Sequence, residues 1–506
     1  MGYHPGMEDD GVYLAGIKGR LHPALFAHNA DFFRLQLRLT IFDRLIAQSI
    51  RLTHIPLPWA ILFWQHLSLF VILWAARRIA AQLFPESYAQ WAGVAMLGAM
   101  FTLPVAGTAL NIADQHLHPR NIATALILLA VSRILERRTS GSPRTRGPQR
   151  AVLARWGEGT GLRPWGERNW QAVALLLVAF AFHPLMGAMG LSFCCVLSLT
   201  LLKPLQHQIR VWRSRLIDQM ATPALAAIPF AWIFDPPSSQ WLEALHTRHW
   251  IRLYDWTWYE WLGAIAPLAL FWLVSRVARK RGEFMLGRFA TAIFVYGIFQ
   301  QAVAMILLGP QALIAFSTLE PMRYLQIIYI FMALVGGCYL GRYVLKARAW
   351  RWGLYLLILN VPMFYVQRQI FASTPHLELP NTAPSNAWLQ AFDWIKHNTP
   401  TSAYFALDPK YLAAPGEDYH GFRALAERSS LADAIKDTSV VTKVPQLGPT
   451  WKEQTLAQAG WTQFQLSDFQ RLKSRFGVDW VLVSWPQSVP LNCHWHNDTL
   501  AVCQIP

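Results

Sequence analysis

The sequence predicts an α-helical polytopic membrane protein with about ten transmembrane helices and a C-terminal α/β domain. Of its 506 residues, 54% are hydrophobic, including 24 Trp and 28 Phe, which is more than a soluble chain of this length carries. These residues fall in separated runs of membrane-crossing length rather than evenly. The final part alternates short apolar stretches with turn residues. We therefore expect an N-terminal segment (1–55), a transmembrane domain (56–368) and a compact tail domain (369–506).

Apolar runs long enough to cross, or nearly cross, a bilayer define the transmembrane domain. Several are shorter than about 20 residues, which predicts tilted or broken helices, and the short pair around His183-Pro184 could be re-entrant. The runs cover 57–82, 90–108, 121–136, 169–183, 186–203, 220–234, 258–277, 287–308, 322–345 and 352–368.

The basic residues predict the orientation of these helices. Lys and Arg concentrate in alternate loops, and loops of this kind face the cytoplasm. The acidic N-terminal stretch, the loops near 109–120, 235–257 and 309–323, and the tail then share the external side. The basic residues ahead of the first run, such as Lys18 and Arg51, run against this pattern. The cytoplasmic loops would hold Arg77 and Arg78, the Arg residues from Arg133 to Arg168, Lys203 to Arg215, Arg276 to Arg288, and Arg342 to Arg351.

The formal charge of +16 follows from these loops and not from a basic folded surface. We therefore expect no nucleic-acid partner. The Thr139–Arg168 insert, rich in Arg, Gly and Pro, predicts a disordered cytoplasmic loop.

The tail predicts a small α/β fold. Ser385–Asn398 is an amphipathic helix pattern, and Ala403–Leu407 and Asp479–Ser484 are strand patterns. Ser467–Phe476 is a further helix, in which Ser467 and Gln470 three residues on form a capping-box pattern.

The five cysteines divide into two groups. Cys194, Cys195 and Cys338 lie inside apolar runs and are expected to be packed side chains. Cys493 and Cys503 flank the turn-prone Asn497-Asp498, so a hairpin could join them by a disulfide in an oxidising compartment. The sequence leaves open whether this bridge forms.

Three successive carboxylates, Glu8, Asp9 and Asp10, stand beside an apolar segment before the first long run. Charge at a membrane surface is costly unless it is used, so these residues are candidates for function. The alternative is that they cap a surface helix.

The loop near 109–120 contains Asp114, His116, His118 and Arg120 within seven residues. Such a set could bind a divalent metal ion or a phosphate. His116 and His118 would converge on an extended segment and diverge on a helix. A plain interfacial polar loop is the alternative.

Arg120 and Arg323 are among the few cations in the external loops, and each sits at a membrane edge. Because a guanidinium can donate two hydrogen bonds to the oxygens of one phosphate, a lipid phosphate is the expected partner. Each could instead snorkel to headgroups or pair with a carboxylate such as Glu320. His183 could be a general base or a phosphate ligand, or only a polar turn before Pro184.

The layout and several short motifs resemble the GT-C glycosyltransferases, and more closely an uncharacterised bacterial family of GT-C-like membrane proteins. The motifs are Glu8 to Leu14, Asp114 to Arg120, His183-Pro184-Leu185-Met186, Pro321-Met322-Arg323, and the tail segments Gly421-Phe422-Arg423 and Glu427-Arg428-Ser429.

The resemblance implies a multi-pass protein of the bacterial inner membrane with a periplasmic tail domain. Its partners would be a polyprenyl-phosphate-linked sugar, membrane lipid, and a glycan or lipid acceptor. Asp9 or Asp10 would be catalytic, and a divalent metal ion on His116 and His118 is a further expectation. Substrate would be bound by Glu8, Asp114, Arg120, His183 and Arg323.

Two departures from that class stand out. A transmembrane helix usually precedes the acidic loop, but only seven residues precede Glu8, which leaves a missing first helix open. Trp256-Thr257-Trp258 is not the Trp-Trp-Asp signature of oligosaccharyltransferases, which argues against protein N-glycosylation. A non-enzymatic transport or assembly factor on the same scaffold is the alternative function.

Overall fold

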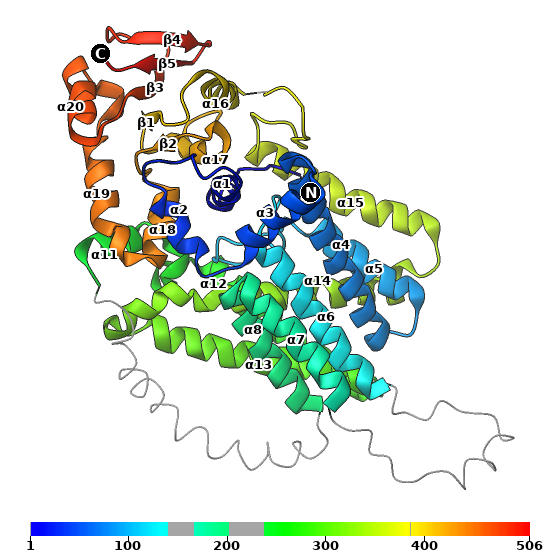
Figure 1. Cartoon of the computed structure of the whole chain (residues 1–506). Coiled ribbons are helices and arrows are strands. Elements are labelled where there is room, and N and C mark those ends of the chain that lie inside the picture. The colour runs from blue at the N-terminus through cyan, green and yellow to red at the C-terminus, as the bar shows by residue number, and fades with distance from the viewer. Residues whose placement is uncertain (1, 140–165, 202–236, 385) are drawn as a thin grey trace, which may run out of the picture.

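The computed structural model describes residues 2–139, 166–201, 237–384 and 386–506 (Figure 1). The expected span at 220–234 and most of the expected disordered insert, Thr139–Arg168, lie outside the described residues. The described chain is mostly helical, with a small sheet near its C-terminus, as the sequence predicts.

Three short helices form the N-terminal segment: α1 (Asp10–Leu21), α2 (Asp31–Leu37) and α3 (Phe42–Thr53). The acidic stretch predicted as a loop therefore runs directly into a helix, because α1 begins at Asp10. The apolar side chains of α1 are buried, so this segment is enclosed rather than free at a surface.

The apolar runs form a bundle of helices. Within the described ranges, five stretches are long and apolar enough to cross a membrane, namely Leu57–Leu83, Pro184–Leu201, Trp258–Lys280, Phe284–Leu308 and Leu313–Leu345. The multi-pass helical architecture is confirmed, and the number of about ten spans stays a prediction. The helices are α4 (Leu57–Leu83), α5 (Ser87–Ala99), α6 (Pro119–Thr139), α7 (Gly166–Phe182), α8 (Pro184–Leu201), α12 (Trp258–Lys280), α13 (Phe284–Leu308), α14 (Tyr324–Leu340) and α15 (Ala349–Ile370).

The predicted span 90–108 is wrong in its second half. Helix α5 ends at Ala99, and the chain then folds back on itself through a bridge between Pro104 and Asn111. Proline has no amide hydrogen to donate and disfavours a helix running through it. The returning loop delivers Asp114 to His118 to the start of α6.

Ion pairs tie the helices together at the end that carries the basic loops. Arg78 bonds Glu136 with its Nε 3.0 Å from Oε1, and Arg342 reaches both Glu86 and Glu283. His118, His183 and Arg323 stand at the opposite helix ends. The arrangement agrees with the prediction that the basic loops share one side, and which side is cytoplasmic stays a prediction.

The tail contains a five-stranded sheet of order β2-β1-β3-β5-β4. β1 pairs in parallel with β2 and β3, whereas β3, β5 and β4 are antiparallel. Alternate strand residues face two cores, one covered by α16 and α17 and the other by α20. The elements are α16 (Ala387–Asn398), β1 (Tyr404–Ala406), α17 (Phe422–Ala426), β2 (Ser429–Ser430), α20 (Leu466–Phe476), β3 (Trp480–Ser484), β4 (Asn492–His496) and β5 (Leu500–Gln504).

The predicted α/β tail is therefore confirmed, with one correction. Helix α20 begins at Leu466, one residue before the expected cap Ser467. Its capping carboxylate is Asp468, which accepts the backbone N–H of Gln465 at 2.9 Å. A shorter Asp side chain at the third helical position serves where the sequence pattern had indicated Gln470.

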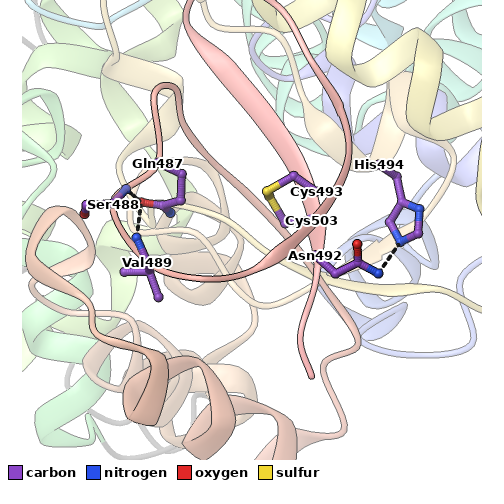
Figure 2. Close-up of a disulfide and its surroundings, with 7 residues drawn as sticks. All are labelled: Gln487, Ser488, Val489, Asn492, Cys493, His494 and Cys503. Atoms are coloured by element: carbon purple, nitrogen blue, oxygen red, sulfur yellow. Dashed lines mark hydrogen bonds between the residues drawn. A yellow bond between two sulfur atoms is a disulfide. The ribbon is translucent and has the colours of Figure 1, made fainter.

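Cys493 and Cys503 form the disulfide that the sequence left open (Figure 2). They are register partners on the neighbouring antiparallel strands β4 and β5. The bridge closes the distal edge of the sheet.

One part of the tail packs away from this sheet. Helices α18 (Lys436–Lys443) and α19 (Gly448–Ala457) contact α11 (Ser239–His246), and α18 also contacts α2. Val440 and Val441 belong to the same apolar core as the membrane helices. This contact brings tail side chains to the N-terminal acidic stretch.

Candidate functional site

The Gly421-Phe422-Arg423 segment of the tail packs against the acidic stretch and hydrogen-bonds to it. The Gly421 N–H donates to the Gly6 carbonyl at 2.9 Å, and the Glu8 N–H donates to Tyr419 at the same distance. Gly421 lies directly against Gly11, where a Cβ on Gly421 would stand 2.9 Å from the Gly11 Cα. Only glycine allows this approach.

Charged residues near Gly421 form ion pairs with distant segments of the chain. The Arg423 guanidinium bonds both carboxylate oxygens of Asp437 at 2.7 and 2.8 Å. Glu427 pairs with Lys18 at 2.7 Å and with Lys396 at 2.9 Å. These pairs hold the N-terminal segment against the tail.

Asp9 precedes α1, yet its side chain makes no capping hydrogen bond. Its Oδ1 accepts the Lys436 Nζ at 2.8 Å, and its Oδ2 lies 3.6 Å from the His118 Nε2. Burial opposes ionisation of Asp9, but Lys436 and His118 outweigh it and hold the pKa of this carboxyl well below its usual value. Asp9 is thus a charged group shared by three segments, and the helix-capping alternative does not describe it.

Asp10 faces elsewhere. It is 1% exposed, and its carboxylate accepts the Gly6 N–H at 2.6 Å, which closes the tight turn before α1. Burial raises its pKa to about 7. Glu8 lines a cavity of ≈30 Å³ together with Arg423 and Asp433, beside Lys436.

Asp114 and Arg120 form a buried two-pronged ion pair. The Arg120 Nε lies 3.1 Å from Oδ2, and a terminal nitrogen bonds Oδ1. The Arg120 N–H also donates to the His118 Nδ1 at 2.9 Å. Because Nδ1 accepts, the remaining ring proton sits on Nε2, which faces Asp9. Burial lowers the His118 pKa, so the imidazole is neutral and donates toward Asp9.

His116 is 2% exposed, and neither ring nitrogen has a partner among the described residues. Burial lowers its pKa to about 3. The His116 and His118 ring centroids are 5.9 Å apart with the rings tilted by 58°. In the described part of the chain, no three His, Cys, Asp or Glu side chains are arranged to hold a metal ion. Metal binding by these histidines stays a prediction.

His183 and Arg323 complete the predicted set. His183 stands at the corner between α7 and α8, its ring centroid 6.1 Å from that of His118. Burial and the nearby charges of Arg323 and Arg120 hold its pKa well below the usual value. Arg323 is 7% exposed and pairs with Glu320, as the carboxylate alternative expected.

Two cations of the site, Lys436 and Lys443, were not singled out from the sequence, and a third, Arg248, lies beside them. Lys436 contacts Asp9, and Lys443 lies 4.0 Å from the Glu320 Oε1. Arg248, 7% exposed, donates to the Ile435 carbonyl and has an unpartnered Nε. The two lysines are seven residues apart, which places them on one helix face, and this spacing was the signal available in the sequence.

The structure therefore brings Asp9, Asp114, His116, His118 and Arg120 together and places His183 and Arg323 beside them. Asp10 is separated from this group by its turn. The site combines side chains from the N-terminal stretch, the loop before α6, the α7–α8 corner, the start of α14 and tail helix α18.

Solved structures similar to this chain include three of archaeal oligosaccharyltransferase from Archaeoglobus fulgidus. The apo form has a TM-score of 0.46, the AglB complex with an inhibitory peptide and a dolichol-phosphate 0.45, and the complex with Zn and sulfate 0.42. Each is 12% identical and covers 95% of this chain. The chain spans 66%, 66% and 64% of their respective lengths.

No family model and no curated protein matches the sequence.

Proposed function

We propose that the protein is a GT-C-like membrane glycosyltransferase that transfers a sugar from a polyprenyl-phosphate donor to a glycan or lipid acceptor. The observation that carries this proposal is the placement of Asp9. Its partly exposed carboxylate lies between Lys436 and His118, close to the ends of membrane helices that present Arg323 and His183. An ionised carboxylate beside cations suits a reaction in which an acceptor hydroxyl meets a lipid-linked phosphate.

Asp9 is suited to orienting an acceptor hydroxyl rather than to removing its proton early. A carboxylate whose pKa is held low is a weak base, but it accepts a strong hydrogen bond. His118 fixes the direction of the carboxylate through its Nε2 proton. The new bond forms between the acceptor oxygen and the sugar C1, while the bond from C1 to the phosphate oxygen breaks. The electron pair of that bond leaves with the polyprenyl phosphate, and the acceptor proton passes to the Asp9 carboxylate as the new bond forms.

Arg323 and Lys443 are suited to hold the departing phosphate. In the structure, Arg323 pairs with Glu320, and the Lys443 Nζ lies 4.0 Å from the Glu320 Oε1. Phosphate oxygens would take the place of that carboxylate, since a guanidinium and an ammonium bind either anion. Arg120 supports the site indirectly, because Asp114 occupies its guanidinium.

Transfer assays on the full chain reconstituted in lipid nanodiscs test this proposal. Decaprenyl phosphates carrying single radiolabelled hexoses serve as donors, with glycolipid extracts as acceptors. We expect label to pass into a glycan or lipid, and Asp9→Asn to reduce the rate by about a hundredfold or more. Asp31→Asn, an exposed carboxylate on the same segment, is the matched control and should keep the rate.

Two outcomes would contradict the proposal. One is an unchanged rate in Asp9→Asn. The other is an absence of transfer from every donor combined with movement of the labelled lipid across the bilayer, which would favour the transport alternative.

A further inference from the structure

Two cations of the site lack a carboxylate of their own. Among the described residues, Asp9 pairs with Lys436, Asp114 with Arg120 and Glu320 with Arg323. Arg248 pairs with no carboxylate there, and Lys443 only approaches Glu320 at 4.0 Å.

The burial of Arg248 makes this imbalance informative. The residue is 7% exposed, its Nε has no partner, and its guanidinium carbon stands 5.1 Å from the Trp250 ring centroid. A buried charge without a counter-charge costs several kcal/mol, so such a group is retained where an anion will meet it. Hydrogen bonding to the Ile435 carbonyl orients the guanidinium, and the charges of Asp433, Asp9 and Glu320 act on it without a direct ion pair.

Both cations act on the carboxylates of the site. The charges of Asp9 and Glu320 reach Arg248 and also reach Lys443. Arg248 approaches from the loop after α11, and Lys443 from the last turn of α18. Arg323 lies at the start of α14, and it shares Glu320 with Lys443.

We propose that Arg248 and Lys443, together with Arg323, form a site for two linked phosphates, so that the donor is a polyprenyl diphosphate sugar. This inference rests on the proposed function. A lipid-linked sugar monophosphate carries one negative charge, which Arg323 can meet with Lys443 beside it. A lipid-linked sugar diphosphate carries two, so Lys443 would be shared between the phosphates and the second phosphate requires Arg248 in addition.

Binding of short lipid phosphates to the reconstituted full chain tests this inference without any transfer step. The probes are farnesyl diphosphate, farnesyl phosphate and inorganic pyrophosphate, each titrated by calorimetry. We expect farnesyl diphosphate to bind more tightly than farnesyl phosphate by on the order of tenfold or more. In Arg248→Gln combined with Lys443→Gln, the ratio should fall to near one.

Arg252→Gln is the matched control, because Arg252 lies on the same loop, is partly exposed and pairs with Asp255. It should keep the preference. Arg248→Lys retains the charge and should keep most of it, which separates loss of the anion site from a folding defect.

A ratio near one in the natural protein, or a preference that survives the double substitution, would overturn the inference. Pyrophosphate binding as tightly as farnesyl diphosphate would assign the site to a soluble diphosphate and overturn the lipid-linked donor. If the protein transfers sugar but binds farnesyl diphosphate no more tightly than farnesyl phosphate, only the diphosphate inference is wrong. If it prefers farnesyl diphosphate but transfers no sugar, the proposed function is wrong.

Discussion

The two parts of the tail use their charges differently. On helix α18, Lys436 and Lys443 reach carboxylates more than a hundred residues away in sequence, at Asp9 and Glu320. On helix α20, the charges pair nearby: Arg471 with Asp468 at 2.9 Å, and Arg475 with Glu453 at 2.8 Å. The α18 part joins the core of the membrane domain, and the α20 part packs on its own sheet.

This difference separates residues that build the site from residues that support the fold. Exposed local ion pairs contribute little to stability, whereas a buried pair that joins distant segments fixes their relative positions. The tail therefore completes the candidate site through α18 and stabilises itself through the distal sheet. Substitutions in the two parts should separate in the same way.

The largest effect is expected for Lys436→Met. Removing the ammonium takes away the nearest counter-charge of Asp9, so the pKa of Asp9 should rise and its carboxylate lose its fixed position. Transfer should fall about a hundredfold, and the pH at which activity is half-maximal should move upward. Arg471→Gln on α20 should leave the pH profile unchanged. An equal loss in both variants would remove the distinction between the two parts.

The features that the sequence predicts and those that it misses divide in a similar way. Membrane helices and the tail strands were predicted because hydrophobic length and alternation are local signals. Topology alone predicted that Asp9, Asp10, Arg120 and Arg323 share one side, although Asp10 turns to the Gly6 N–H and away from the others. Lys436 was missed because its importance depends on the docking of α18 against α11, which no local pattern encodes.

A smaller effect is expected for Gly421→Ala. A Cβ at this position would stand 2.9 Å from the Gly11 Cα, so the acidic stretch must shift away from the tail. Overpacking of this kind costs about 1–3 kcal/mol, and the displaced Asp9 should lower transfer by roughly tenfold. Gly353→Ala is the control, because a Cβ there meets nothing within 4 Å. Wild-type transfer and thermal stability in Gly421→Ala would show that the close approach is not needed.

The stability of the fold should depend on pH through a buried cluster formed by His4, Glu378 and His420. Glu378 accepts from His4 at 2.6 Å and from His420 at 3.1 Å. Burial opposes the charge of His420, but Glu378 raises its pKa from 6.5 to about 9. The stabilisation is therefore complete below about pH 6.5 and is lost as the pH rises through 9, amounting to at most about 3 kcal/mol.

Thermal unfolding between pH 6 and 9.5 measures this loss. Glu378→Gln should flatten the curve, since the amide no longer favours the imidazolium, and transfer at pH 7 should change only a few-fold. His494→Asn, in the distal sheet, is the control and should keep the slope. A slope that persists in Glu378→Gln would place the titrating group elsewhere.

The smallest effect on transfer is expected for Cys493→Ser combined with Cys503→Ser. The disulfide joins β4 and β5 across 10 residues of sequence, on the far edge of the sheet from α18. Closing a loop of this size in the unfolded chain stabilises a fold by about 3 kcal/mol, so the thermal midpoint of the tail should fall. Transfer below that midpoint should be unchanged, because none of the residues around Asp9 contacts this strand pair. A loss of transfer without unfolding would mean that the distal sheet positions α18, and the division of the tail into two parts would have to be abandoned.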